Sequence, residues 1–225
     1  MGWSDWVRGV EIEPSIYAAD FSRLGEQLEA LIHAGVRIFQ FDVGDGQFVE
    51  PITIGPVVLK SISPMVHERG GVLDVHLMIV SPEKHFRAIA EAGGDSVTVH
   101  YEVCDDLPSV IAQARELGLG AGVAFNPETQ PDDVAEAAGE LVDLVLCMSI
   151  HPGYSGQPFM PESIPRVRRL REVLPDGVHV QVDGGVGAEN VPQLVEAGAN
   201  LLVAGTSVFG QGDIAEAYRR LAALG

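Results

Sequence analysis

One aspartate in this chain stands directly before two glycines at the end of an apolar run, Val182-Asp183-Gly184-Gly185. A carboxylate can take up or release a proton during a reaction. Glycines let the backbone approach a ligand closely, so that their NH groups can face an anion. These four residues therefore predict a site that combines an acid or base with an anion-binding turn.

Other polar side chains interrupt apolar runs in places where they could join Asp183. Gln40 and Asp42 are two residues apart, so in a strand both point to the same face. His76 ends another apolar run, where it could meet Asp42. His100 ends the next run, and for this residue a core histidine and a functional histidine are both open interpretations.

Two further segments contain the small residues that phosphate-binding loops use. Residues 153–156 read Gly-Tyr-Ser-Gly, and Gly205-Thr206 follows the last apolar run. Either segment alone is a weak signal, but in barrels the loops after the seventh and eighth strands commonly bind phosphate. Together with Gly184 and Gly185 they predict a phosphorylated substrate. Asp45, which precedes a glycine, is expected to shape a turn.

These residues fall within a regular alternation of apolar runs and amphipathic stretches. We expect strands near residues 11–16, 37–43, 72–77, 95–100, 119–125, 142–148, 178–183 and 200–204. We expect helices over residues 21–34, 56–66, 82–92, 107–117, 131–138, 161–173, 188–197 and 214–224, several of which begin at or after Pro and end near Gly. Continuously apolar strands are typical of a parallel sheet covered by helices.

Eight such units in 225 residues favour an α/β fold, a single (β/α)8 TIM barrel, over an open doubly wound sheet. We expect one domain over residues 1–225, with residues 1–9 as an N-terminal extension. The active site of such a barrel lies at the carboxyl ends of its strands. The aspartates and histidines above are expected at those ends.

Composition narrows the class of protein further. The net charge of −18 opposes binding to nucleic acid or to anionic membranes, because both would begin with repulsion. No apolar run approaches the ~18 residues of a membrane-spanning helix, and no secretory signal is legible. Cys104 and Cys147 lack metal-ligand spacing and are expected to be free thiols in a reducing compartment. We therefore expect a cytoplasmic protein.

Eight ordered segments give the chain a resemblance to a known family. They are Pro14-Ser15, Phe41-Asp-Val-Gly-Asp-Gly-Gln-Phe-Val49, Ile52-Thr-Ile-Gly-Pro56, Asp74-Val-His-Leu-Met78, Asn126-Pro127, His151-Pro-Gly-Tyr-Ser-Gly-Gln157, Val182-Asp-Gly-Gly185 and Ala204-Gly-Thr206. In this order and at these separations they resemble ribulose-phosphate 3-epimerase, from about Ile12 to the C-terminus. The resemblance implies a barrel of the ribulose-phosphate-binding type.

The resemblance also implies an isomerase that inverts C3 of a pentulose 5-phosphate, D-ribulose 5-phosphate or D-xylulose 5-phosphate. Asp42 and Asp183 match the family's acid/base pair, in which one carboxyl takes the C3 proton and the other returns a proton to the opposite face of a cis-enediolate. The implied substrate contacts are Ser15, His76, Met78, Met148, Gly153, Tyr154, Ser155, Gly156, Gly184, Gly185, Gly205 and Thr206. A homo-oligomer is implied as well.

The implied cofactor is a divalent metal ion, Zn, Fe, Mn or Co. Its family ligands are the same two aspartates and two histidines, of which His76 matches one and Gln40 stands in place of the other. An amide oxygen is a poorer zinc ligand than imidazole and suits harder ions better. The metal in this chain is therefore expected to be absent, weaker or different.

Other positions also depart from the family pattern. Tyr17-Ala18 replaces Leu-Ser, Gly44 replaces a methionine, and Gln47 replaces a histidine. In the glycine-rich loop, His151 and Ser155 stand where Asn and Gly are common. We expect Gly44 to vacate volume and Tyr17 to add a phenol, which would reshape the floor of the pocket.

Three alternatives follow from these departures and from other barrel chemistries. A Schiff-base aldolase needs a lysine at a strand end, but Lys60 and Lys84 fall in expected helices. A divergent relative that acts on another sugar phosphate in a specialised pathway stays open. A non-catalytic sugar-phosphate binder also stays open, although Asp42, His76 and Asp183 are all retained.

Overall fold

A computed structural model describes residues 2–225 of the chain. Eight strands form one parallel sheet in the order β1-β8-β7-β6-β5-β4-β3-β2. A parallel bridge between Ser15 and Gln40 joins the first strand to the second and closes the barrel. The strands are β1 (Glu11–Pro14), β2 (Ile38–Gly44), β3 (Val72–Met78), β4 (Ser96–His100), β5 (Gly120–Phe125), β6 (Leu144–Met148), β7 (His179–Asp183) and β8 (Leu201–Ala204). The predicted TIM barrel and its strands are confirmed.

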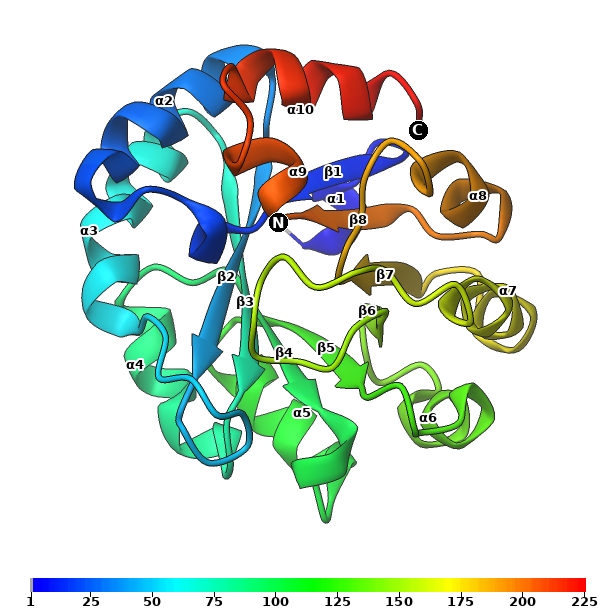
Figure 1. Ribbon diagram of the computed structural model, residues 1–225. Helices are drawn as coiled ribbons and strands as arrows, with labels where there is room; N and C mark the ends of the chain where they lie inside the picture. Colours follow the sequence, from blue (N-terminus) through cyan, green and yellow to red (C-terminus); the bar gives the residue numbers. More distant parts are fainter. Residues whose placement is uncertain (1) are drawn as a thin grey trace.

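Helices surround this ring of strands (Figure 1). They are α2 (Leu24–Ala34), α3 (Pro56–Glu68), α4 (Phe86–Glu91), α5 (Leu107–Glu116), α6 (Pro131–Ala138), α7 (Ser163–Val173), α8 (Val191–Glu196) and α10 (Ile214–Ala222). Short 3₁₀ turns η2 (Phe21–Arg23) and η3 (Pro82–His85) precede α2 and α4 and account for the longer helices predicted there. Three more short segments were not predicted: η1 (Ile16–Ala18), η4 (Tyr101–Val103) and α9 (Thr206–Phe209).

The segment expected as an N-terminal extension contains a short helix, α1 (Trp3–Trp6), that packs on the barrel. Trp3 is buried, and its indole Nε1 donates to Ser96 Oγ at 3.1 Å. Gly120 is also in close contact, since a Cβ there would lie 2.9 Å from the same nitrogen. Ser96 and Gly120 begin β4 and β5, so Trp3 covers the end of the barrel opposite the carboxyl ends of its strands.

The barrel interior carries a buried polar layer beneath the strand ends. Gln181 Nε2 donates to Glu13 Oε2 at 2.6 Å and to Asp74 Oδ2 at 3.0 Å. All three side chains are buried. Burial, followed by the nearby Asp74 carboxyl, raises the pKa of Glu13 well above its ordinary value. The direction of this shift reflects the cost of placing a second negative charge beside Asp74 in a buried position.

Two simpler expectations concern cysteines and membranes. Cys104 and Cys147 are free cysteines, as predicted. Within residues 2–225, every helix is too short or too polar to cross a lipid bilayer.

Candidate active site

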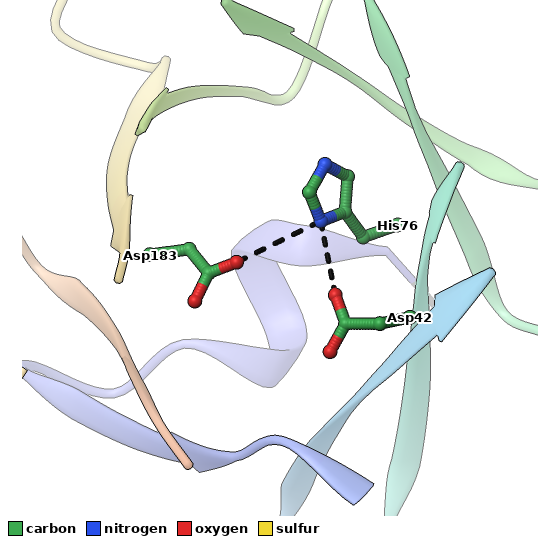
Figure 2. Close-up of side chains that lie close together, drawn as sticks. All are labelled: Asp42, His76 and Asp183. Carbon is green, nitrogen blue, oxygen red and sulfur yellow. Dashed lines mark hydrogen bonds and ion pairs between the residues drawn. The ribbon is translucent and has the colours of Figure 1, made fainter. Parts of the chain in front are cut away.

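Asp42, His76 and Asp183 come together at the carboxyl ends of β2, β3 and β7. His76 Nδ1 lies 3.0 Å from Asp42 Oδ1 and 3.8 Å from Asp183 Oδ2 (Figure 2). Asp42 and His76 are paired residues of neighbouring strands, so their side chains leave the sheet side by side. Asp183 approaches from a strand that neighbours neither of them. The predicted meeting of these three residues is confirmed.

The electrostatics of this cluster follow from burial and like charge. The His76 side chain is fully buried, and those of Asp42 and Asp183 are 6% and 18% exposed. Burial, followed by the charge of Asp42, raises the pKa of Asp183 to about 7. Burial lowers the pKa of His76, but the adjacent Asp42 outweighs it and the pKa is raised. Both shifts show that the cluster favours an added positive charge.

A divalent cation would supply this positive charge, and the carboxylate and imidazole groups of the cluster are common metal ligands. Asp42, His76 and Asp183 each offer one ligand atom, and these atoms lie within 4.8 Å of one another. Two carboxylates and one imidazole suit zinc and the harder divalent ions alike. The three residues therefore form a group that could hold a metal ion.

Gln40 lies in β2, the same strand as Asp42, and faces the Asp42 carboxylate. It is fully buried. With its amide oriented so that the nitrogen faces Asp42, Nε2 donates to the two carboxylate oxygens at 3.2 and 3.3 Å. The opposite orientation would place the amide oxygen against oxygens that can only accept. This geometry favours Gln40 as a donor that holds Asp42 over Gln40 as a metal ligand.

Hydroxyl groups fix both aspartates in position. Ser15 Oγ donates to Asp42 Oδ2 at 2.5 Å, and Thr53 Oγ1 donates to the Asp42 carbonyl at 2.8 Å. Ser149 Oγ lies 2.8 and 2.7 Å from the carbonyl oxygens of Asp183 and Gly184, which share its single proton. Sequence reasoning missed Thr53 and Ser149, because neither stands out from an ordinary loop hydroxyl.

His100 lies behind His76, away from the carboxylates. The two Nε2 atoms are 2.9 Å apart, and His100 Nδ1 lies 3.3 Å from Glu102 Oε2. His100 is fully buried, and burial lowers its pKa to about 4. Sequence reasoning missed Glu102, although its spacing of two residues from His100 was a usable signal.

A cleft opens beside Asp42 and Asp183, and both side chains line it. Of the expected substrate contacts, Ser15, Met78, Gly153, Tyr154, Ser155, Gly156, Gly184, Gly185, Gly205 and Thr206 line it. His76 and Met148 are buried and are not among the residues that line it. Ile150, Val186 and Val203 also line the cleft, and sequence reasoning missed them because they resemble core residues.

Three loops converge on one end of this cleft. A Cβ on Gly205 would lie 3.1 Å from Ser155 Oγ, and a Cβ on Gly156 would lie 3.7 Å from Thr206 Cγ2. Gly185 has a φ of +63°, and a Cβ there would lie 2.5 Å from the Phe159 backbone nitrogen. The loops after β6 and β8 are therefore in contact, and only glycine fits the turn after β7.

The cleft is lined without Lys or Arg among the residues that the structure describes. An anion bound there would be held by backbone NH groups and hydroxyls. The first NH groups of α9 have no partner within that helix. These donors fit a phosphate group.

Some residues that depart from the family pattern line the cleft and others do not. Tyr17 and Ser155 line it, and for Tyr17 this was expected. The expectation that Gly44 vacates volume is wrong. A Cβ there would lie 2.9 Å from the Pro51 carbonyl oxygen and 2.9 Å from Val49 Cγ2, so the loop after β2 already fills the space.

Gln47 and His151 are both exposed and are not among the residues that line the cleft. Asp45 shapes its turn as predicted. Its Oδ1 accepts from the Gln47 and Phe48 NH groups, each at 2.8 Å.

Comparison with known proteins agrees with this site. A model of the Ribulose-phosphate 3 epimerase family matches residues 11–209. A ribulose-phosphate 3-epimerase of Synechocystis is 44% identical over 93% of this chain and 92% of its own length. A ribulose-phosphate 3-epimerase of Bacillus subtilis is 40% identical over 91% and 94%. The chloroplastic ribulose-5-phosphate-3-epimerase of Arabidopsis thaliana is 43% identical over 94% and 76%.

Solved structures that share the fold are more distant in sequence. A 3-hexulose-6-phosphate synthase is 20% identical with a TM-score of 0.70, over 95% of this chain and 99% of that one. Orotidine 5'-phosphate decarboxylase from Pyrococcus horikoshii is 16% identical with a TM-score of 0.70, over 95% and 98%. These similarities describe the fold alone.

The raised pKa of Asp183 predicts how stability depends on pH in chelator-treated protein. The folded-state pKa of about 7 lies above the ordinary value of 3.8, so the stabilising effect of the protonated acid is lost as pH rises through 7. Asn carries no charge at any pH. Asp183→Asn should therefore raise the free energy of unfolding by roughly 2–4 kcal/mol near pH 8 and by much less near pH 5.

Urea denaturation at both pH values measures this difference. Asp105→Asn, at an exposed position, is the matched control and should change neither value. If Asp183→Asn raised the free energy of unfolding equally at both pH values, Asp183 would not be a buried acid whose ionisation destabilises the fold.

Proposed function

Because the chain belongs to the ribulose-phosphate 3-epimerase family, we propose that it interconverts D-ribulose 5-phosphate and D-xylulose 5-phosphate by inverting C3. The observation that carries the proposal is the meeting of two carboxyl groups, from β2 and β7, beside one cleft. Epimerisation removes a proton from one face of a carbon and returns one to the other face. Two acid/base groups that reach the same carbon from different strands supply this directly.

Asp42 and Asp183 are assigned the proton transfers. One carboxylate takes the C3 proton, and the other, as a carboxylic acid, gives a proton to the opposite face of the enediolate. An acid/base group works best in both directions when its pKa lies near the working pH. The pKa of about 7 at Asp183 supports this role. Ser15 and Gln40 orient the Asp42 carboxylate through their hydrogen bonds.

Asp42, His76 and Asp183 are proposed to hold the divalent metal ion. When bound, the ion would offset the negative charge that develops on the substrate oxygens during proton removal. Gln40 is assigned a supporting role as donor to Asp42. With one imidazole fewer than the family's ligand set, the site should bind its metal less tightly and favour harder ions.

The far end of the cleft is assigned to the phosphate. Gly153 to Gly156, Gly184, Gly185, Gly205 and Thr206 line that end, and the cleft offers no basic side chain among the described residues. Backbone NH groups and the hydroxyls of Ser155 and Thr206 are the available donors. A phosphate bound there would leave the sugar carbons beside Asp42 and Asp183.

Isotope exchange tests the acid/base assignment. In D₂O with metal supplied, the protein should incorporate deuterium at C3 of both pentulose phosphates, since the returned proton comes from a solvent-exchangeable carboxyl. Asp42→Asn and Asp183→Asn should each slow exchange by about 10²- to 10⁴-fold. NMR spectroscopy of the sugar measures the exchange, and Asp105→Asn is the control.

Retained exchange in either active-site variant would refute its role. Absence of exchange in the wild type would refute the reaction with these substrates. That result would favour the second candidate function, a divergent enzyme that acts on another sugar phosphate. Tyr17 and Ser155, which depart from the family pattern and line the cleft, are the observations in its favour.

Gln40→His tests the role of position 40. It should tighten Zn²⁺ binding by about tenfold or more, because imidazole adds a fourth good ligand. Gln40→Met, similar in length but without hydrogen bonds, should not tighten it. Competition with a chelator measures both affinities. Unchanged binding in Gln40→His would show that the ion does not lie beside Asp42.

Three other expectations stay proposals. The chain is proposed to act as one domain over residues 1–225, in the cytoplasm, as a homo-oligomer. Ile52 and Val57, each 83% exposed near the loop after β2, are apolar surface that a second copy could cover.

A further inference from the structure

Behind His76, one of the proposed metal ligands, lie two side chains that the reaction itself does not use, His100 and Glu102. His76 Nε2 lies 2.9 Å from His100 Nε2, and the other nitrogen of His100 lies 3.3 Å from Glu102 Oε2. Each contact requires one donor and one acceptor. The proton positions can therefore be derived in order, starting from Glu102.

Glu102 can only accept. Its Oε1 accepts from the Asn126 NH at 2.7 Å and from Thr129 Oγ1 at 2.5 Å. Burial raises its pKa, but the hydrogen bonds from His100, Thr129 and Asn126 outweigh burial and lower the pKa to about 2. Arg166 holds this loop in place through the Asn126 carbonyl at 2.7 Å. Glu102 is therefore an anchored carboxylate, and His100 Nδ1 must carry the proton between them.

Full burial disfavours a charged imidazolium at His100. It has no exposed surface and packs against Phe48, with the ring centroids 4.6 Å apart. A neutral imidazole with its proton on Nδ1 has a lone pair on Nε2. The contact with His76 can then form only if His76 Nε2 is the donor.

We propose that His100 and Glu102 are positioning residues that keep the His76 proton on Nε2 and so present its Nδ1 lone pair to the cation held with Asp42 and Asp183. This inference rests on the proposed metal site and assigns two residues that do not touch the ion. It explains why a carboxylate is fixed so firmly at a distance from the reaction.

His100 must hold the His76 proton on Nε2 because Asp42 attracts that proton to the other nitrogen, Nδ1. Its Oδ1 lies 3.0 Å from His76 Nδ1 and would by itself draw the imidazole proton to that nitrogen. The lone pair would then point away from the cation site. Acceptance by His100 at the other nitrogen opposes this pull. Partners of this kind, one step removed from a metal, typically change its affinity by about 10- to 100-fold.

The proton positions in the wild type are the first test. Nitrogen NMR of histidine-labelled, metal-free protein should show the proton of His100 on Nδ1 and a bare Nε2. The Zn²⁺-loaded protein should show the His76 proton on Nε2. A proton on Nε2 of His100 in either the metal-free or the Zn²⁺-loaded protein would overturn the proposal. This measurement needs no variant, no substrate and no enzymatic activity.

Glu102→Gln is the decisive variant. Its Oε1 can still accept from Asn126 and Thr129, but an NH₂ group replaces Oε2 and must donate to His100 Nδ1. The His100 proton should then move to Nε2, and the His76 proton to Nδ1. Zn²⁺ affinity, measured by chelator competition, should fall by about 10- to 100-fold.

Glu116→Gln, on the exposed face of α5, removes the same charge and should leave both affinity and proton positions unchanged. Wild-type affinity in Glu102→Gln would overturn the proposal. Weakened binding with the original proton positions would also overturn it, since the loss would then be structural. Failure of the epimerase assignment would appear instead as absent C3 exchange with these proton positions intact.

Discussion

The site depends on one electrostatic constraint: two carboxylates, Asp42 and Asp183, lie beside a single imidazole nitrogen in a largely buried position. Like charges at this depth cannot both persist without a counter-charge. A proton or a cation must neutralise one of the two charges. The reaction proposed for this chain uses a proton on one carboxyl and a cation beside both. The raised pKa values of Asp183 and His76 express the same demand.

Much of the barrel around this cluster serves to keep it in place. Ser15, which with Gln40 forms the bridge that closes the barrel, donates to Asp42, and Ser149 holds the backbone of Asp183. Below them, Gln181 joins Glu13 to Asp74, so polar groups continue into the interior. The barrel thus orients its aspartates by hydrogen bonds from hydroxyl groups just beyond the ends of other strands, Ser15 after β1 and Ser149 after β6.

The sequence was sufficient for the barrel, its strands and the meeting of Asp42, His76 and Asp183, because strand alternation and strand ends fix which side chains share a face. It did not reveal Trp3 as a cover for the barrel, since a tryptophan in a short terminal segment has no periodicity to interpret. It also misjudged Gly44, whose missing side chain is replaced by Val49 and Pro51. Packing of this kind depends on loop conformation, which composition does not encode.

Calorimetric titration of metal-free protein with Zn²⁺ tests the central claim most directly, in two buffers of different ionisation enthalpy near pH 7. Binding to Asp42, His76 and Asp183 must displace protons, because Asp183 and His76 both have raised pKa values. The account predicts one ion per chain with release of about one proton. Binding without proton release, or equal binding in the Asp42→Asn and Asp183→Asn double variant, would contradict it.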